Sequence, residues 1–282
     1  MRRVTSKDGT SIAYERLGHG PAVVLVGGAL VDPVTGRAGR WENAPLAAEL
    51  AERFTVVNYD RRGREESGDT LPYAVEREIE DLEALVAETG GSAHVHGVSS
   101  GGALALEAAA AGVAFDKISV YEVPYSVDDY AAQAWQEYVE QLDTALAEGR
   151  RGDAVALFML LAGSSEDQVA SARGSPMWPG LEAIAHTLAY DAAVLGDGRP
   201  PTARLATVMQ PTLVATGAAP PDAEGEAPPD AEGGGLPPAF FDQAADAIAA
   251  SLPRAERVTV EGQTHVTDPK TFAPVLERFF AD

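Results

Sequence analysis

A serine between two closely spaced glycines is the first group in this sequence whose type and surroundings could do chemistry. Residues 93–106 read AHVHGVSSGGALAL, with a short strand pattern before Ser99 and a helix pattern rich in alanine and leucine after it. Glycines two positions before and two after a serine allow strand and helix to meet at a tight turn, because they have no Cβ. We therefore expect Ser99 at the tip of a strand–turn–helix unit, with its hydroxyl exposed.

A serine hydroxyl near neutral pH needs a base within hydrogen-bond reach, and that base needs a carboxylate to hold its tautomer. His265 follows the last strand pattern and precedes Asp268-Pro269, a helix start, so it lies in a loop. His94 and His96 share one face of the strand before Ser99, and no third ligand accompanies them, so we expect them to pack rather than to bind a metal. The sequence favours His265 as the base.

Strand and helix patterns alternate along the chain, and they must position these groups. A hairpin pattern spans residues 2–17. Strand patterns follow at 21–26, 54–59, 93–98, 117–122, 212–216 and 257–260. The most apolar of these runs lack alternation, as strands covered on both faces require. A parallel sheet with helices on both faces collects ligands at the carboxyl ends of its strands, where Ser99 lies.

Residues 125–204 break this alternation, because they contain helical patterns and no obvious buried strand. We expect a core formed by 1–124 and 205–282, with 125–204 as a helical cap inserted over the sheet edge. Large side chains of the cap could line a pocket for a mainly apolar small molecule. The candidates are Tyr125, Trp135, Phe158, Met159, Trp178 and His186.

A short repeat stands apart from these elements. Residues 219–225 (APPDAEG) recur as 227–233, and two further glycines follow the second copy. No residue in the repeat can supply a packed apolar face, so the sequence predicts a flexible, acidic loop over 218–238.

Composition limits the possible partners. The formal net charge of −22 over 282 residues disfavours nucleic acid and anionic membrane surfaces, which leaves a small-molecule substrate. The sequence has no cysteine, which excludes disulfides, thiolate zinc sites and a cysteine nucleophile. We expect no cofactor and no metal. The N-terminus begins without an apolar segment, so a cytoplasmic protein is expected.

The G-x-S-x-G turn between strand and helix, the helical insertion and the late histidine resemble the α/β-hydrolase family over essentially the whole chain. The resemblance implies the α/β-hydrolase fold, a mostly parallel doubly wound sheet with a helical cap. It also implies that Ser99 is the nucleophile and His265 the base. The oxyanion donors would be the backbone NH groups of Ala29 and Ser100. Residues 60–64 (DRRGR) resemble the family's D-x-R-G loop.

The sequence departs from the family pattern at two places. Gly27-Gly28 stands where a histidine-glycine pair is common, which should still leave the backbone donor in place. The usual position of the acid, after strand 212–216, holds Gly-Ala-Ala-Pro. Glu122 ends the strand after the serine helix, a location that some members use for the acid, and it is our preferred carboxylate. Asp222, within the repeat, and a site without an acid remain the alternatives.

The nucleophile limits the reaction. Relatives of this fold that cleave epoxides or haloalkanes use aspartate at the turn, whereas a serine points to acyl transfer. We expect hydrolysis of an ester, lactone or thioester through an acyl-enzyme, and the same residues could cleave a carbon–carbon bond of a diketone. The alternatives are a biosynthetic cyclase or acyl transferase on the same scaffold, or a ligand-binding pseudo-hydrolase.

Overall fold

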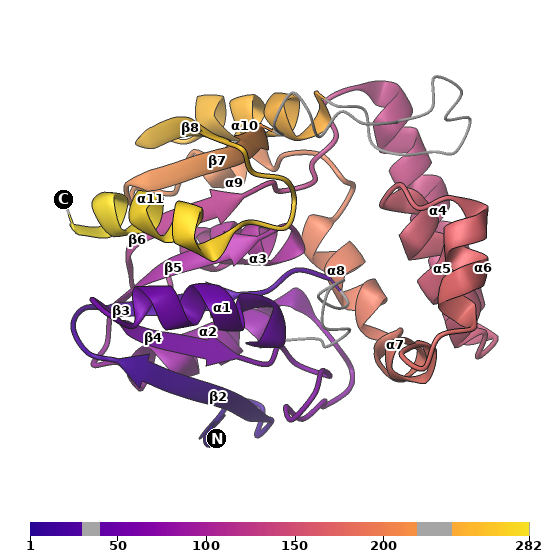
Figure 1. The fold of residues 1–282 in the computed structure, drawn as a ribbon, viewed down its shortest axis with the longest axis horizontal. Coiled ribbons are helices and arrows are strands. Elements are labelled where there is room, and N and C mark those ends of the chain that lie inside the picture. The colour runs from indigo at the N-terminus through magenta and orange to yellow at the C-terminus, as the bar shows by residue number, and fades with distance from the viewer. Residues whose placement is uncertain (30–39, 219–238, 282) are drawn as a thin grey trace.

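The computed structural model describes residues 1–29, 40–218 and 239–281, and within them eight strands form one sheet (Figure 1). The strand order is β1-β2-β4-β3-β5-β6-β7-β8. The strands are β1 (Arg2–Thr5), β2 (Ser11–Gly18), β3 (Ala22–Val26), β4 (Thr55–Tyr59), β5 (Ala93–Val98), β6 (Phe115–Tyr121), β7 (Thr212–Ala218) and β8 (Ala255–Glu261). The helices are α1 (Arg40–Leu50), α2 (Val75–Ala87), α3 (Ser100–Ala110), α4 (Asp129–Ala147), α5 (Arg151–Leu161), α6 (Glu166–Arg173), α7 (Trp178–Ile184), α8 (Thr187–Leu195), α9 (Thr202–Leu205), α10 (Phe240–Ser251) and α11 (Pro269–Ala281).

Strands β3 to β8 run parallel, and only the β1–β2 hairpin and the β2–β4 pair are antiparallel within the described residues. The predicted doubly wound, mostly parallel sheet is confirmed. In a parallel sheet the carboxyl ends of all strands meet at one edge. Residues that directly follow β3, β5, β6, β7 and β8 are therefore neighbours in space although they are far apart in the sequence.

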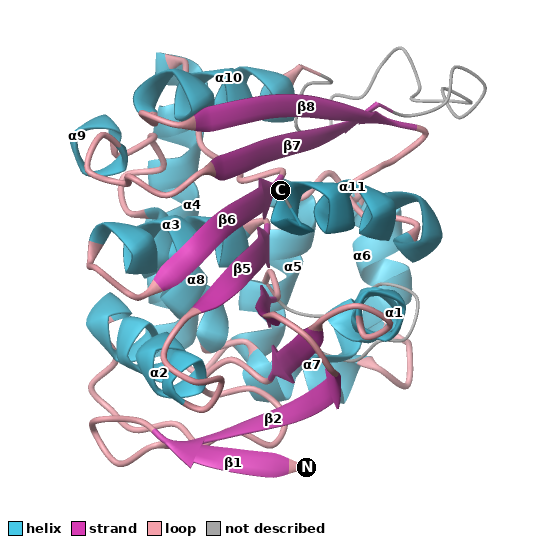
Figure 2. Ribbon diagram, turned by 90° about the vertical axis from the view of Figure 1, so that its left-hand side faces the viewer, coloured by secondary structure: helices cyan, strands magenta, loops and turns pink. Residues whose placement is uncertain are grey.

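Helices cover both faces of the sheet, which explains why the residues of β4 are all buried and why β3 is an unbroken apolar run (Figure 2). Helices α1 and α11 pack on one face of the sheet. There Leu50 of α1 and Phe280 of α11 belong to one apolar cluster with the odd-numbered residues of β3, such as Val23. Helices α2, α3 and α10 pack on the other face against Val24 and Val26. The two apolar layers hold the strands in register.

A helical segment, α4 to α9, connects β6 to β7. Helices α4 to α7 build an apolar cluster of their own, which includes Leu142, Val155 and Trp178. Helix α8 lies between this cluster and the sheet (Figure 1), and its Val194 and Leu195 pack with α2 and α3. Helix α8 therefore joins the helical segment to the strand edge, while the division into a core and a cap at 125–204 stays a prediction.

The predicted loop 218–238 is only partly described. Ala218 is the last residue of β7 and pairs with Glu261 of β8, so the prediction that the loop begins at Ala218 is wrong. The pairing with β8 extends β7 by two residues beyond its apolar run. The remainder of the loop, including the repeat and Asp222, lies outside the described residues.

His94 and His96 pack within the fold, as predicted. The His96 ring is 1% exposed, with its Nδ1 3.1 Å from the Ser119 hydroxyl and its ring against Phe272. His94 stacks on Phe280. Burial lowers the pKa of His96 to about 3, because the apolar surroundings disfavour the charged imidazolium.

The lowered pKa of His96 predicts that the folded protein loses stability in acid because of this one residue. Unfolded histidine titrates near pH 6.5, so between there and about pH 3 the unfolded chain binds a proton that the folded chain does not. The free energy of unfolding therefore falls as pH falls, by about 1.4 kcal/mol per unit. His96→Asn should remove about 2 kcal/mol of the loss between pH 7 and pH 5, measured by urea unfolding at both pH values.

The matched control is His19→Asn, which replaces an exposed imidazole. It should reproduce the parent's pH dependence. An equal loss of stability in the parent and in His96→Asn would contradict the assignment of this acid lability to the buried ring.

Candidate active site

Ser99 occupies a sharp turn between β5 and α3, with a φ of 54° and a ψ of −128°. A non-glycine residue in this region costs about 1–3 kcal/mol and persists only where its surroundings enforce it. A Cβ on Gly97 would lie 2.4 Å from the carbonyl oxygen of Gly101, and one on Gly101 would lie 2.4 Å from that of Gly27. Only glycine fits on either side, and the predicted strand–turn–helix unit is confirmed.

The turn also brings the end of β5 close to the ends of its neighbours. The Ser99 NH donates to the carbonyl oxygen of Tyr121, at the end of β6. Residue 97 pairs with Val26, at the end of β3, so Ala29 and Ser100 follow adjacent strand ends. The structure thus brings the two predicted oxyanion residues to the same edge as Ser99, and their role stays a prediction.

Glu122 and His265 form the contact that defines this edge. The His265 Nδ1 lies 2.7 Å from the Glu122 Oε2, and the other carboxylate oxygen accepts a hydrogen bond of 2.9 Å from the Gly217 NH. The Glu122 side chain is buried, whereas the imidazole is 45% exposed and stacks on Phe241. A carboxylate at Nδ1 favours the tautomer that carries its proton there, which leaves Nε2 as an acceptor.

Ser99 is half-buried as a residue. Within the described residues, no hydrogen bond joins it to the His265 ring. Both residues nevertheless follow parallel strands of one sheet, with β6 and β7 between β5 and β8. In unliganded structures such hydrogen bonds are often long and tighten only when substrate binds.

The loop that carries His265 is held by residues that the sequence analysis did not identify. The Tyr121 hydroxyl donates to the Thr264 carbonyl oxygen at 2.6 Å. The buried Gln263 side chain accepts from the Asp268 NH at 2.7 Å. A tyrosine at the end of a predicted strand was a signal for such a contact, because a buried hydroxyl needs a partner. No sequence signal marked Gln263.

The predicted pocket residues do not form one group. Phe158, Met159 and Trp178 pack in the apolar cluster of α4 to α7. Trp135 donates from its indole nitrogen to the Gly196 carbonyl oxygen at 3.0 Å. The His186 Nε2 lies 3.2 Å from the Oδ2 of Asp69, a residue between β4 and α2. Contact of these side chains with a substrate stays a prediction.

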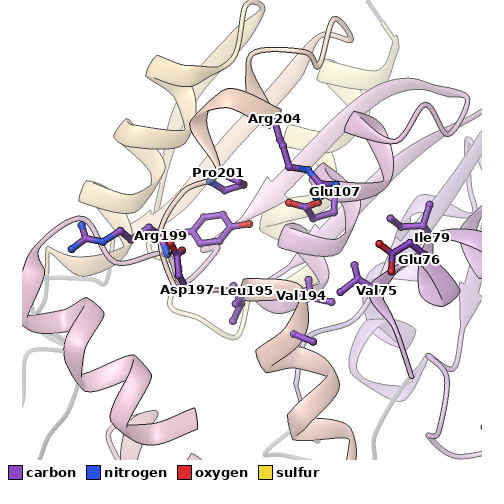
Figure 3. A pocket seen from close by; sticks show the side chains of 13 residues that line it. Val75, Glu76, Ile79, Glu107, Val194, Leu195, Asp197, Arg199, Pro201 and Arg204 are labelled. Carbon is purple, nitrogen blue, oxygen red and sulfur yellow. Dashed lines mark hydrogen bonds and ion pairs between the residues drawn. The ribbon is translucent and has the colours of Figure 1, made fainter. Parts of the chain in front are cut away.

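Tyr125 lines a separate cavity of about 270 Å³ between α2, α3 and the loop after α8 (Figure 3). Its ring is 1% exposed and packs with the sheet core. The cavity also contains the ion pair of Glu107 and Arg204, whose side chains lie next to each other in Figure 3. Neither Ser99 nor His265 is among the residues that line it.

The described part of the chain contains no cluster of three or more histidine or acidic side chains arranged to hold a metal ion. It also contains no helix with the length and apolar character needed to cross a membrane.

Comparison with known proteins agrees with this fold. Residues 17–275 match the model of the alpha/beta hydrolase family. The crystal structure of an alpha/beta hydrolase from Sphaerobacter thermophilus DSM 20745 is 49% identical, covers 99% of this chain and 100% of its own, and superposes with a TM-score of 0.81. The enol-lactonase from Burkholderia xenovorans LB400 is 18% identical with full coverage of both chains and a TM-score of 0.66.

A curated relative matches over a shorter stretch. The uncharacterized hydrolase YraK of Bacillus subtilis (strain 168) is 36% identical over 103 residues, which is 35% of each chain. The family match, by contrast, spans β3 to β8, the serine turn and the His265 loop. The chain therefore belongs to the alpha/beta hydrolase family.

Proposed function

We propose that this protein is a serine hydrolase that cleaves a carboxylic ester, lactone or thioester through an acyl-enzyme. The observation that carries the proposal is the 2.7 Å contact between His265 Nδ1 and the buried Glu122 carboxylate. It lies at the strand edge where the strained turn presents Ser99. An imidazole oriented by a carboxylate at Nδ1 is equipped to accept a proton at Nε2.

In the proposed reaction, the Ser99 oxygen attacks the substrate carbonyl while His265 Nε2 accepts the hydroxyl proton. The negative charge on the carbonyl oxygen is held by the backbone NH groups of Ala29 and Ser100. Collapse of the tetrahedral intermediate breaks the bond to the alcohol or thiol, which takes the proton from His265. A water molecule, deprotonated by His265, then hydrolyses the acyl-enzyme and restores the Ser99 hydroxyl.

Glu122 is the proposed acid because its surroundings hold it in one orientation. Both of its oxygens have partners, the Gly217 NH on one side and His265 on the other. Hydrogen bonds to the charged form stabilise a carboxylate at a buried position. The position that usually provides the acid, directly after residue 216, lies within β7 here, and its Gly217 NH donates to Glu122 instead.

The substrate is proposed to enter between the strand edge and the helical segment 125–204, assigned here as a cap. Ala29 packs against the apolar cluster of that segment, which places the segment beside one oxyanion donor. Apolar side chains there favour a mainly apolar acyl group. An enol-lactonase shares this fold, so the fold is compatible with lactone cleavage.

A cyclase or acyl transferase on the same scaffold is the second candidate. It is favoured by one observation, that no hydrogen bond joins Ser99 to His265 in the described residues. A cyclase would retain turnover without the serine. A pseudo-hydrolase would neither turn over a substrate nor react at Ser99.

Ser99→Ala should lower the esterase kcat by roughly a thousandfold or more, because the nucleophile is lost. The measurement is hydrolysis of 4-nitrophenyl butyrate, together with labelling of the parent by a fluorophosphonate and mass mapping of the adduct. Ser92→Ala, at an exposed position, is the matched control and should keep parent activity. A parent that carries no adduct on Ser99 would contradict the hydrolase proposal.

Glu122→Gln should lower kcat by roughly a hundredfold or more, because the amide cannot stabilise the imidazolium that forms during attack. Glu261→Gln removes an exposed glutamate at the end of β8 and serves as control. Kinetics on the same ester would check both variants. Parent activity in Glu122→Gln, together with a loss in Asp222→Asn, would assign the acid to Asp222 instead.

A further inference from the structure

A buried carboxylate of α8 connects the helical segment to the serine turn. Asp191 is 4% exposed. Its Oδ1 accepts hydrogen bonds of 2.7 Å from the Ser100 hydroxyl and from Arg61 Nη1, and its Oδ2 accepts one of 2.7 Å from Arg64 Nη2. Burial by itself would raise the pKa of Asp191, but Arg64, Arg61 and the Ser100 hydroxyl together lower it. The side chain is therefore ionised and fixed on both oxygens.

The two arginines that Asp191 holds also reach the loop after β3. Arg61 Nη1 lies 3.3 Å from the carbonyl oxygen of Gly27, and Arg64 Nη1 donates to that of Gly28. Gly27 and Gly28 directly precede Ala29 in the sequence. Asp191 thus contacts Ser100 directly. It contacts the loop of Ala29 indirectly, because Arg61 lies against the carbonyl oxygen of Gly27 and Arg64 donates to that of Gly28.

We propose that Asp191 is a positioning residue that sets the spacing between the two oxyanion donors, the NH groups of Ala29 and Ser100. The inference rests on the proposed function, because it presupposes that these groups bind an oxyanion. Donors act on the transition state only when they are held near 3 Å from the position that the oxyanion will occupy. The two donors lie on different elements, and Asp191 of α8 adds contacts to both of them, directly to Ser100 and through Arg64 to Gly28.

The carboxylate is required because both of its oxygens are acceptors. An asparagine at 191 would keep one acceptor and turn an NH₂ group toward a guanidinium, which is itself only a donor. Arg61 would still be held by a bidentate pair with Glu78, at 2.8 Å for each bond. Arg64 would lose its ion pair with Asp191 and with it the anchor for its hydrogen bond to Gly28.

The same loop provides a matched control. Arg62 lies between these arginines in sequence and forms an equally buried ion pair with Asp81, at 2.7 Å. Its remaining donors face the N-terminal hairpin, where they contact Asp8 and Thr10. Asp81→Asn therefore disrupts a buried arginine pair of the same loop without touching the Ala29 loop or Ser100.

The experiment compares the kinetics of the parent with those of Asp191→Asn, Asp81→Asn and Ser100→Ala. The substrates are 4-nitrophenyl butyrate and its thionoester, and the temperature is kept below the thermal unfolding midpoint of every variant. Sulfur is a weak hydrogen-bond acceptor, so the thionoester depends less on the oxyanion donors than the oxygen ester does. Fluorophosphonate labelling of the parent at Ser99 is the first measurement, because it tests the proposed function separately.

We expect Asp191→Asn to lower kcat for the oxygen ester about ten- to a hundredfold with little change in KM, and to lower thionoester turnover much less. Asp81→Asn should keep kcat within about threefold and the ester-to-thionoester ratio unchanged. Ser100→Ala, which keeps both ion pairs of Asp191, should show a smaller loss in the same direction and covers the case in which Asp191→Asn does not fold.

Four results would overturn the inference. If Asp191→Asn lowers kcat equally on both esters, or if Asp81→Asn lowers it by the same factors, Asp191 has a structural role only. If Asp191→Asn does not fold, an unchanged ester-to-thionoester ratio in Ser100→Ala overturns it. A parent that is not labelled at Ser99 removes the proposed function and this inference with it, whereas labelling with unchanged ratios in the variants removes the inference alone.

Discussion

The backbone conformation of Ser99 is the constraint on which the rest of the site depends. Its φ of 54° is enforced from both sides, because Gly97 and Gly101 each pack within contact distance of other backbone atoms. The neighbours of Gly101 include carbonyl groups at the end of β3, so the turn is pressed against the loop that carries Ala29. The apolar burial of β5 and α3 offsets the cost of this conformation. The strained turn and the neighbouring loop therefore form one unit.

Buried charge surrounds this unit. Arg61, Arg62 and Arg64 are each about 1% exposed, although the chain as a whole is strongly acidic. Buried ion pairs contribute little net stability, because removing two charges from water costs about as much as their attraction returns. Their geometry is nevertheless specific, since a guanidinium can bind a carboxylate and a carbonyl oxygen at once. All three arginines follow β4, and two of them, Arg61 and Arg64, also bind carbonyl oxygens of the loop after β3.

The Glu122–His265 contact illustrates how a parallel sheet allows one role to be filled from different strands. Neighbouring strands lie about 4.8 Å apart, so a carboxylate at the end of β6 or of β7 can reach the same imidazole. Here the backbone near the end of β7 donates the Gly217 NH to Glu122, and Tyr121 fixes the carbonyl of Thr264 beside the histidine. Tyr121, the last residue of β6, and Glu122, which follows it, thus both contact the His265 loop.

The sequence by itself determined the serine turn, the alternating strands and the loop that holds His265, because each depends on local spacing and on glycine positions. The sequence also made Glu122 a candidate for the acid, because Glu122 lies at the end of a predicted strand. Asp191 could not be found in this way, since it lies 92 residues after Ser99 (191 − 99 = 92) on a helix with no motif. Tyr125 is a pocket candidate by its residue type, and only the packing shows that it lines the cavity beside α2 and α3. Which side chains meet across elements is decided by how helices pack on the sheet, and this information is not contained in local sequence spacing.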